Sequence, residues 1–400
     1  MKQGQNLKTL RGNNLALLLS TIWENEGISR AKLAKNTGLA PSSVTRLTRE
    51  LQEIGLIVES GKGSSSGGRQ PVLISPNPKA GVVISFDLSG SRVRGGVFDA
   101  SNNLLKVAEV PFLNVGPEAI QKYIFELMDT LLSDQAILKE KLLGIGVSIP
   151  GVVNIDRTGI SIAFNLQLKD FPLKKILESR YNIPVYLETD TSVAALAEKN
   201  YGAAIHQDNF IYVLISTGIG AGVIINGEIY QGQAGMDGER GHIVINPQGP
   251  VCVCGRHGCL EAIAGRNALL ENAKSIFSDG RDQIANNLLN NDTSSLNLSL
   301  ISEAAKLGSV KAMDLINNMA EHIAYAISLY TNILDIPLVI IGGEVPLELG
   351  DCYIQAIKRK SRKFIPDDKT VIIKQAELKR DDLLRGISKL TIQQILLDVI

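Results

Sequence analysis

The 400-residue sequence predicts an α/β protein in two parts, a small helical N-terminal domain and a larger body of two α/β lobes around a cleft. In the first 76 residues, three helical patterns precede two strand-like runs. From residue 80 onward, strand-like runs alternate with longer helical patterns, and a strand–turn–strand opening recurs. The charge divides in the same way, with 11 Lys/Arg and 5 Asp/Glu in residues 1–80 against 30 and 36 in the rest.

The composition is that of a globular chain, with 44% hydrophobic and 20% charged residues. A basic first segment on an acidic body indicates a polyanion partner for that segment alone. We find no signal peptide and no apolar run of membrane-spanning length. Three of the four Cys lie within eight residues, which favours a metal ligand set over disulfides and predicts a cytoplasmic protein.

The N-terminal domain is expected to span residues 1–76. Its helices are expected at residues 14–23, 30–36 and 41–54. Ser29 is a suitable N-cap for the second helix, Gly38 supplies the turn after it, and Pro41 fits the first turn of the third. Hairpin strands are expected at residues 56–59 and 71–74, around a Gly/Ser-rich tip. This is the layout of a winged helix-turn-helix domain.

The third helix has one apolar stripe that we expect to be buried, formed by Val44, Leu47, Leu51 and Ile54. The outward-facing side chains are Ser42, Ser43, Thr45, Arg46 and Arg49. In a DNA major groove, Arg binds guanine edges, and Ser and Thr bind phosphates or bases. Lys62 and Arg69 put positive charge on the hairpin, which suits a minor groove or the DNA backbone.

These side chains predict double-stranded DNA as the partner of the N-terminal domain. The alternative is a winged helix that binds protein and leaves this polar helix face in solvent. DNA is favoured because the helix spacing, the turn glycine, the hairpin and the charge asymmetry agree. Such motifs usually act in pairs on two half-sites, so a dimer is also predicted.

The body is expected to contain one lobe at residues 80–190 and another at residues 191–384. Strands are expected at residues 81–87, 93–98, 143–148, 185–188, 210–216, 222–225 and 338–341. Helices are expected at residues 118–132, 192–201, 260–273 and over much of 302–334. The segment 275–300 is rich in Asn, Asp and Ser, and predicts loops or short helices.

A compact group of candidate metal ligands lies in the second lobe. Cys252, Cys254 and Cys259 are close in sequence, and His242 lies ten residues before the first of them. One His and three Cys form a complete tetrahedral set for Zn²⁺, and four protein ligands leave no open position, so the zinc would be structural. The alternative is a set of reduced cysteines in a tight glycine loop.

Four sequence motifs are spread along the body. They are Gly-x-Gly-x-x-x-Pro-Gly at 144–151, Ser-Thr-Gly-Ile-Gly-x-Gly at 216–222, Gly-Glu-x-Gly-His at 238–242 and Cys-x-Cys-Gly-x-x-Gly-Cys-x-Glu at 252–261. They resemble the motifs of the ROK family (repressors, open reading frames and sugar kinases). With its winged helix, the chain is similar to the xylose-repressor and N-acetylglucosamine-repressor branch. The resemblance covers essentially the whole chain. It implies a ribonuclease-H-like body of the actin and sugar-kinase type, with a helix over 385–400 completing the first lobe.

The resemblance also implies a sugar site in the cleft. Its members would be Gly151, Asn165, Thr189, Asp190, Glu239, His242 and Glu261. Carboxylates and an amide suit a polyol, because together they accept from and donate to several hydroxyls. His242 can serve both sites, with one ring nitrogen on zinc and the other donating to sugar. Taken singly, each carboxylate has the alternative of being a solvated charge.

The ATP half of the site departs from the family pattern. Kinases carry Asn-Asp where this chain has Thr189-Asp190, and the Asp acts as general base on the sugar hydroxyl. The first phosphate loop of the family, Asp-x-Gly-Gly-Thr, is here Asp87-Leu-Ser89-Gly90-Ser91. Ser89 replaces a Gly whose missing side chain lets backbone amides close on phosphate. The second loop keeps Thr217, Gly218 and Gly220, and the adenosine end keeps Gly342 and Gly343.

Phosphoryl transfer depends mainly on positioning and neutralising the phosphates, so the altered first loop argues against efficient use of ATP and Mg²⁺. The favoured function is therefore a repressor, a homodimer or dimer of dimers, that binds operator DNA and is released or modulated by a sugar in the cleft. The alternative is an ATP-dependent sugar kinase with a fused DNA-binding domain, with Asp190 as its base. A third possibility is a body that senses a phosphosugar or a phosphotransferase protein. The motifs do not distinguish pentose, hexose and N-acetylated sugars.

Overall fold

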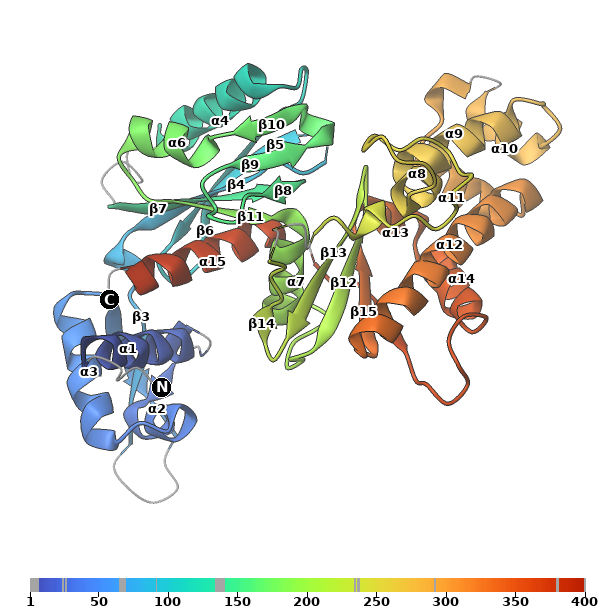
Figure 1. Ribbon diagram of the computed structural model, residues 1–400. Coiled ribbons are helices and arrows are strands. Elements are labelled where there is room, and N and C mark those ends of the chain that lie inside the picture. The colour runs from blue at the N-terminus through green and yellow to red at the C-terminus, as the bar shows by residue number, and fades with distance from the viewer. Residues whose placement is uncertain are drawn as a thin grey trace.

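The computed structural model describes residues 7–23, 25, 27–64, 70–90, 92–133, 141–233, 235, 238–290, 293–378 and 381–398. A small N-terminal head lies against a body of two lobes, and each lobe is built on a five-stranded sheet (Figure 1). Within these ranges, no helix is long and apolar enough to cross a membrane.

The head contains three helices and a three-stranded sheet in the order β1-β3-β2. Its elements are α1 (Leu7–Trp23), β1 (Ile28–Ser29), α2 (Arg30–Thr37), α3 (Pro41–Glu53), β2 (Ile57–Lys62) and β3 (Val72–Pro76). The Ser29 hydroxyl caps α2 by accepting from the Lys32 N–H at 3.2 Å. Gly38 ends α2 with φ 68°, a backbone conformation that favours glycine. The expected helix and hairpin order is confirmed, and α1 begins earlier than expected.

The buried stripe of α3 differs from the prediction at one position. Val44, Leu47 and Leu51 are at most 1% exposed, but Ile54 is 57% exposed. The helix ends at Glu53, and Ile54 serves as its C-cap, so its side chain leaves the apolar face. Thr48 is buried instead, because its hydroxyl donates to the Val44 carbonyl at 2.8 Å and so satisfies its polar group.

The first lobe is built on a sheet with the order β11-β7-β4-β5-β6. Its elements are β4 (Val82–Asp87), β5 (Arg92–Asp99), β6 (Leu104–Pro111), α4 (Pro117–Leu132), β7 (Leu142–Ile149), β8 (Val152–Val153), β9 (Ile160–Ala163), β10 (Leu168–Phe171), α6 (Leu173–Tyr181) and β11 (Val185–Thr189). Strands β4, β5 and β6 form an antiparallel meander, while β7 pairs in parallel with β4 on one side and with β11 on the other. A short sheet, β10-β9-β8, adjoins it.

The second lobe repeats this pairing pattern in the order β14-β13-β12-β15-β16. Its elements are α7 (Asp190–Tyr201), β12 (Phe210–Ile215), β13 (Ile219–Ile225), β14 (Glu228–Ile229), α8 (Leu260–Ala264), α9 (Arg266–Phe277), α10 (Gln283–Leu289), α11 (Leu298–Lys306), α12 (Val310–Leu334), β15 (Leu338–Gly342), α13 (Glu344–Leu349), α14 (Asp351–Ser361) and β16 (Ile372–Gln375). This duplication is the two-lobed, sugar-kinase-like body that the sequence predicts.

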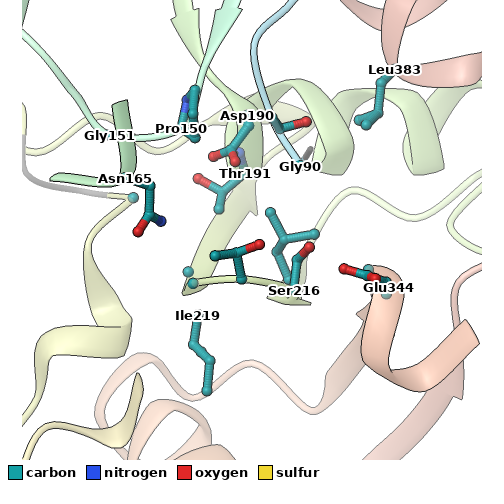
Figure 2. A pocket seen from close by; sticks show the side chains of 18 of the residues that line it. Gly90, Pro150, Gly151, Asn165, Asp190, Thr191, Ser216, Ile219, Glu344 and Leu383 are labelled. Carbon is teal, nitrogen blue, oxygen red and sulfur yellow. The ribbon is translucent and has the colours of Figure 1, made fainter. Parts of the chain in front are cut away.

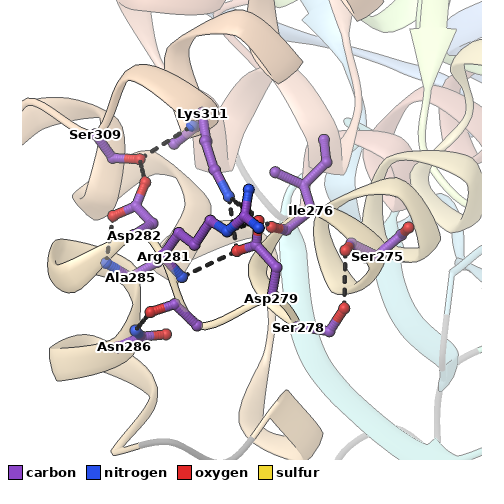
Figure 3. Close-up of polar contacts among 12 residues, drawn as sticks. Ser275, Ile276, Ser278, Asp279, Arg281, Asp282, Ala285, Asn286, Ser309 and Lys311 are labelled. Carbon is purple, nitrogen blue, oxygen red and sulfur yellow. Dashed lines mark hydrogen bonds and ion pairs between the residues drawn. The ribbon is translucent and has the colours of Figure 1, made fainter.

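Two long helices of the prediction are each divided in the structure. The helix expected over 260–273 becomes α8 and α9, interrupted at Gly265, and the helix expected over 302–334 becomes α11 and α12. The Asn-rich segment contains α10 and is held by polar contacts (Figure 3). Asp279 receives two hydrogen bonds from Lys311, and Asp282 caps α10 by accepting from the Ala285 N–H at 3.0 Å.

The C-terminal helix α15 (Asp382–Asp398) connects the head to the body. It packs against β4, β5, β7 and β11 of the first sheet and against α1 of the head. Its Ile392 and Leu396, together with Val83 of β4, are part of the same apolar cluster as the buried leucines of the head. The Trp23 indole N–H also donates to the Ala100 carbonyl of the body at 2.9 Å.

Candidate functional site

A cavity of about 730 Å³ lies between the two lobes. Its walls come from turns at the ends of strands and from the starts of helices α7, α8 and α13. Figure 2 shows Asn165 and Asp190 on one side of the pocket and Glu344 on the other. Ligand sites of two-lobed α/β proteins are commonly found at such a position, where binding can draw the lobes together.

Most residues of the predicted sugar set meet in this cavity. Its lining includes Gly151, Asn165, Asp190, Glu239, His242 and Glu261. Glu261 and Asn165 converge near Gly218, since a Cβ built there would lie 2.7 Å from Glu261 Oε2 and 3.7 Å from Asn165 Nδ2. The cavity therefore brings together acceptors and an amide from four separate chain segments.

Thr189 is placed differently from the rest of this set. It is 4% exposed and is not among the residues that line the cavity. Its hydroxyl caps α7 by accepting from the Ser192 N–H at 3.3 Å, and it also lies 3.3 Å from the Thr191 hydroxyl. Thr189 thus fixes the start of the helix that carries Asp190, and Thr191 faces the pocket instead.

The predicted nucleotide residues divide into two groups. Gly90, Thr217, Gly218, Gly220, Gly342 and Gly343 line the cavity. Asp87 is 3% exposed and lies behind the wall, where one carboxylate oxygen accepts from the Ser89 N–H at 3.1 Å and from the Ser89 hydroxyl at 2.6 Å. Ser91 lies outside the described residues. The side chain at position 89 is therefore bonded to Asp87 within the first turn.

Carboxylates dominate the electrostatics of the cavity. Burial in the cleft, together with the negative charges of Asp87 and Glu239, raises the pKa of Asp190 to about 8. Burial also raises the pKa of Glu261, although the Ile219 N–H donates to this carboxylate at 3.0 Å and opposes the shift. The hydrogen bond with Glu239 raises the pKa of His242, against the effect of burial. This concentration of acceptors suits a ligand rich in hydroxyl donors.

Several cavity residues were not identified from the sequence. Phe164 meets the His242 ring edge-to-face, with ring centroids 5.8 Å apart. Tyr212 lies against Gly342, where an added Cβ would be 2.1 Å from the Tyr212 hydroxyl, so Gly342 is required by this tyrosine. A usable signal for Tyr212 was its position as the one polar-tipped residue within the apolar run 210–215.

The four candidate metal ligands form a compact group beside the cavity. The ligand atoms of His242, Cys252, Cys254 and Cys259 all lie within 4.8 Å of one another. The Cys254 and Cys259 sulfurs are 3.6 Å apart, and His242 Nδ1 lies 3.4 Å from the Cys252 sulfur. Tetrahedral zinc with bonds of about 2.0–2.3 Å places its ligand atoms roughly 3.3–3.8 Å apart, and these two pairs lie in that range. The donor types, one His and three Cys, also suit this ion.

The predicted DNA-contacting side chains lie on the open face of α3. Ser42, Thr45, Arg46 and Arg49 are exposed, and Ser43 is half-buried. Lys62 is exposed at the end of β2, and Arg69 lies outside the part of the chain that the structure describes. The apolar face of α3 packs into the head, so its polar face is free to enter a groove.

A winged helix-turn-helix head on a duplicated sugar-kinase-like body defines a class of DNA-binding proteins that carry a sugar-kinase-like domain. The model of the ROK family matches residues 83–394, so the chain belongs to the ROK family. The model described as a winged helix-turn-helix DNA-binding domain matches residues 17–58.

Similar proteins match over most of the chain. The putative xylose repressor of Caldicellulosiruptor sp. (strain Rt8B.4) is 32% identical and covers 96% of each chain. The N-acetylglucosamine repressor of Escherichia coli O157:H7 is 28% identical over 85% of this chain and 82% of its own. Among solved structures, a ROK family transcriptional regulator described as a homologue of the E. coli Mlc protein has a TM-score of 0.79 at 24% identity, covering 97% of each chain. A glucokinase from Streptomyces griseus has a TM-score of 0.70 at 27% identity, covering 78% of this chain and 99% of its own.

Proposed function

We propose that this protein is a sugar-responsive transcriptional repressor. It binds operator DNA through α3 as a homodimer or a dimer of dimers, and a sugar in the cleft releases or modulates it. The observation that carries this proposal is that one chain combines a polar interlobe cavity with an exposed basic helix in a winged helix-turn-helix head. The cavity brings together Asn165, Asp190, Glu239, His242 and Glu261. The helix exposes Arg46 and Arg49. The names of relatives that match most of the chain, as xylose and N-acetylglucosamine repressors, support the same function.

Sugar and DNA are coupled through linkage. If sugar favours the DNA-free geometry, DNA must weaken sugar binding by the same factor. The four-ligand cluster holds a structural Zn²⁺, and His242 contributes to both the metal set and the cavity wall. The first phosphate turn, in which Ser89 is bonded to Asp87, is a vestige of a nucleotide site.

A thermal-shift screen tests the proposal. Free sugars and sugar phosphates are added with and without ATP and Mg²⁺, because a preferred ligand stabilises the native state by mass action. A free sugar is expected to raise the Tm of the wild-type protein and not that of Glu239→Ala. The matched control is Glu228→Ala, an exposed carboxylate on β14 that should keep the full shift. If no sugar changes the Tm, the proposed pocket is wrong.

The second candidate function is an ATP-dependent sugar kinase. It is favoured by Asp190, which has the family's base position and faces the cavity, and by the likeness to the glucokinase. A coupled assay with ATP, Mg²⁺ and a sugar panel decides between the two. Robust turnover that is lost in Asp190→Asn establishes the kinase. A response to phosphosugars alone, or to a phosphotransferase protein, identifies the third possibility.

A further inference from the structure

Glu198 is a buried carboxylate that no part of the sugar, metal or DNA site uses. It lies on α7 and is 0% exposed. Its Oε2 accepts from the Ala203 N–H at 2.6 Å, and its Oε1 accepts from the Glu377 and Leu378 N–H groups at 3.0 and 3.1 Å. A carboxylate can be kept this deep only when hydrogen bonds replace water, and three backbone donors do so here.

These three donors come from two segments that lie far apart in sequence. Ala203 follows α7 on the path from the first sheet to the second. Glu377 and Leu378 follow β16 and lie on the return path from the second sheet to α15. Glu198 therefore ties together the two connections between the lobes, the segments about which a relative rotation of the lobes would turn.

The close approach of the Glu198 carboxylate requires a glycine at position 202. A Cβ at this position would lie 2.1 Å from Glu198 Oε2. Its φ of −130° is open to any residue, so the requirement for glycine comes from the carboxylate and not from the backbone.

Helix α7 also contacts the first half of α15, and the two helices cross at the junction between the lobes (Figure 1). Val193 of α7 packs with Ile387 and Leu390 of α15 in one buried cluster. Lys389 donates to the Asn200 side chain at 2.6 Å. The same α15 supplies Leu396 to the apolar core of the head. One connected pair of helices thus runs from Asp190 in the cavity to the DNA-binding head.

We propose that Glu198 is a positioning residue that holds the two interlobe connections together, so that closure of the cleft moves α7, α15 and the head as one unit. This inference rests on the proposed function, because it assumes a ligand that closes the cleft. We call residues 376–378, which follow β16, the strap. Without the hydrogen bonds to Glu198, the strap separates from α7, and closure of the cleft displaces the strap and not α15.

The test compares Glu198→Gln with the wild-type protein, using D-xylose, D-glucose and N-acetyl-D-glucosamine as probes and a DNA fragment from upstream of the protein's own gene. The control is Glu377→Gln, which alters an exposed carboxylate whose backbone N–H bonds to Glu198. Allosteric coupling is typically about 5–150-fold. In Glu198→Gln, affinity for sugar alone and for DNA alone should each stay within about threefold, while the effect of sugar on DNA affinity falls to less than about twofold. The control should keep the wild-type effect.

Hydrogen exchange provides a readout that requires neither DNA nor a tightly bound sugar. In Glu198→Gln the amides of Ala203, Glu377 and Leu378 should exchange faster, since each loses a charged acceptor. Gly202→Ala disrupts the same contact, because its added methyl group would collide with the Glu198 carboxylate. This variant replaces Glu198→Gln if Glu198→Gln does not fold. In the wild-type protein these three amides should stay protected with and without sugar.

Full sugar response in a folded Glu198→Gln or Gly202→Ala overturns the proposal, as does loss of protection at these amides when sugar binds to the wild-type protein. If neither these probes nor any sugar of the thermal-shift screen binds the wild-type protein, the proposed function fails. The exchange of the three amides in the variants still decides whether Glu198 holds the strap.

Discussion

The His242 ring contacts the cavity through one nitrogen and the cysteine cluster through the other. Its Nε2 lies 3.2 Å from Glu239 Oε2, and its Nδ1 lies 3.4 Å from the Cys252 sulfur. A bond from Nε2–H to the carboxylate leaves Nδ1 unprotonated, which is the form that binds metal. The metal cluster and the proposed sugar site therefore share one side chain whose orientation each of them fixes.

Loss of the metal should therefore weaken sugar binding as well as stability. Protein purified without chelators should contain one zinc per chain, and Cys254→Ser should lose it, melt at a lower temperature and bind sugar more weakly. Glu239→Gln should lower zinc affinity by about 10–100-fold, as is typical when a carboxylate behind a ligating His is lost. Elemental analysis and thermal shift measure these effects.

The matched control for the metal experiment is Cys352→Ser. Cys352 is half-buried on α14, outside the four-ligand group, and its thiol donates to the Leu349 carbonyl. This variant should keep the zinc and the sugar response. Wild-type protein free of zinc, or a zinc content unchanged in Cys254→Ser, contradicts the assignment.

Arg46→Ala should weaken specific DNA binding by about 1–3 kcal/mol, the value of one good bidentate base contact. The reason is that Arg46 projects from the open face of α3, opposite the buried Val44 and Leu47. Fluorescence anisotropy at one stated salt concentration measures the change, because phosphate contacts make affinity salt-dependent. Lys169→Ala, an exposed cation on β10 of the body, is the control and should bind DNA as the wild type does. Equal affinities for the two variants would remove α3 as the recognition helix.

Helices with a clear apolar periodicity and metal ligands with a characteristic spacing could be predicted from the sequence alone. The 3-4-3 apolar spacing placed α3, and the His-Cys spacing identified a group that folds to within 4.8 Å. Tertiary packing decided what periodicity could not. Thr189 turned from the pocket to cap α7, and Ile54 was exposed because the helix ended one residue before it. Two of the three amides that donate to Glu198 lie 179 and 180 residues away from it in sequence. No local sequence pattern reports such a pairing.

Asp190 should make stability depend on pH. Its pKa of about 8 in the folded protein exceeds the ordinary value of 3.8, so the folded state holds this proton more tightly than the unfolded chain does. Its contribution to stability is therefore fully present below about pH 4 and is lost as the pH rises through about 8. Asp190→Asn removes this titration, so its Tm should exceed that of the wild type by a margin that grows between about pH 5 and pH 9.

The control for this pH series is Asp367→Asn, which changes an exposed carboxylate in the second lobe. Its Tm should follow the wild-type profile at every pH. A constant difference between Asp190→Asn and the wild type across the series contradicts a raised pKa at Asp190.

The last prediction concerns the shared core of head and body, where two neighbouring leucines of α15 differ in burial. Leu396 is 5% exposed and packs in the apolar cluster of the head, whereas Leu397 is 51% exposed. Leu396→Ala should lower the free energy of unfolding by about 2–4 kcal/mol, because it leaves a cavity between α15 and the head. Leu397→Ala should change it by less than about 0.5 kcal/mol. Urea unfolding followed by Trp23 fluorescence reports on this junction, since Trp23 is the protein's single tryptophan and bonds to Ala100 of the body. Equal midpoints for the two variants would show that the head does not depend on α15 for its core.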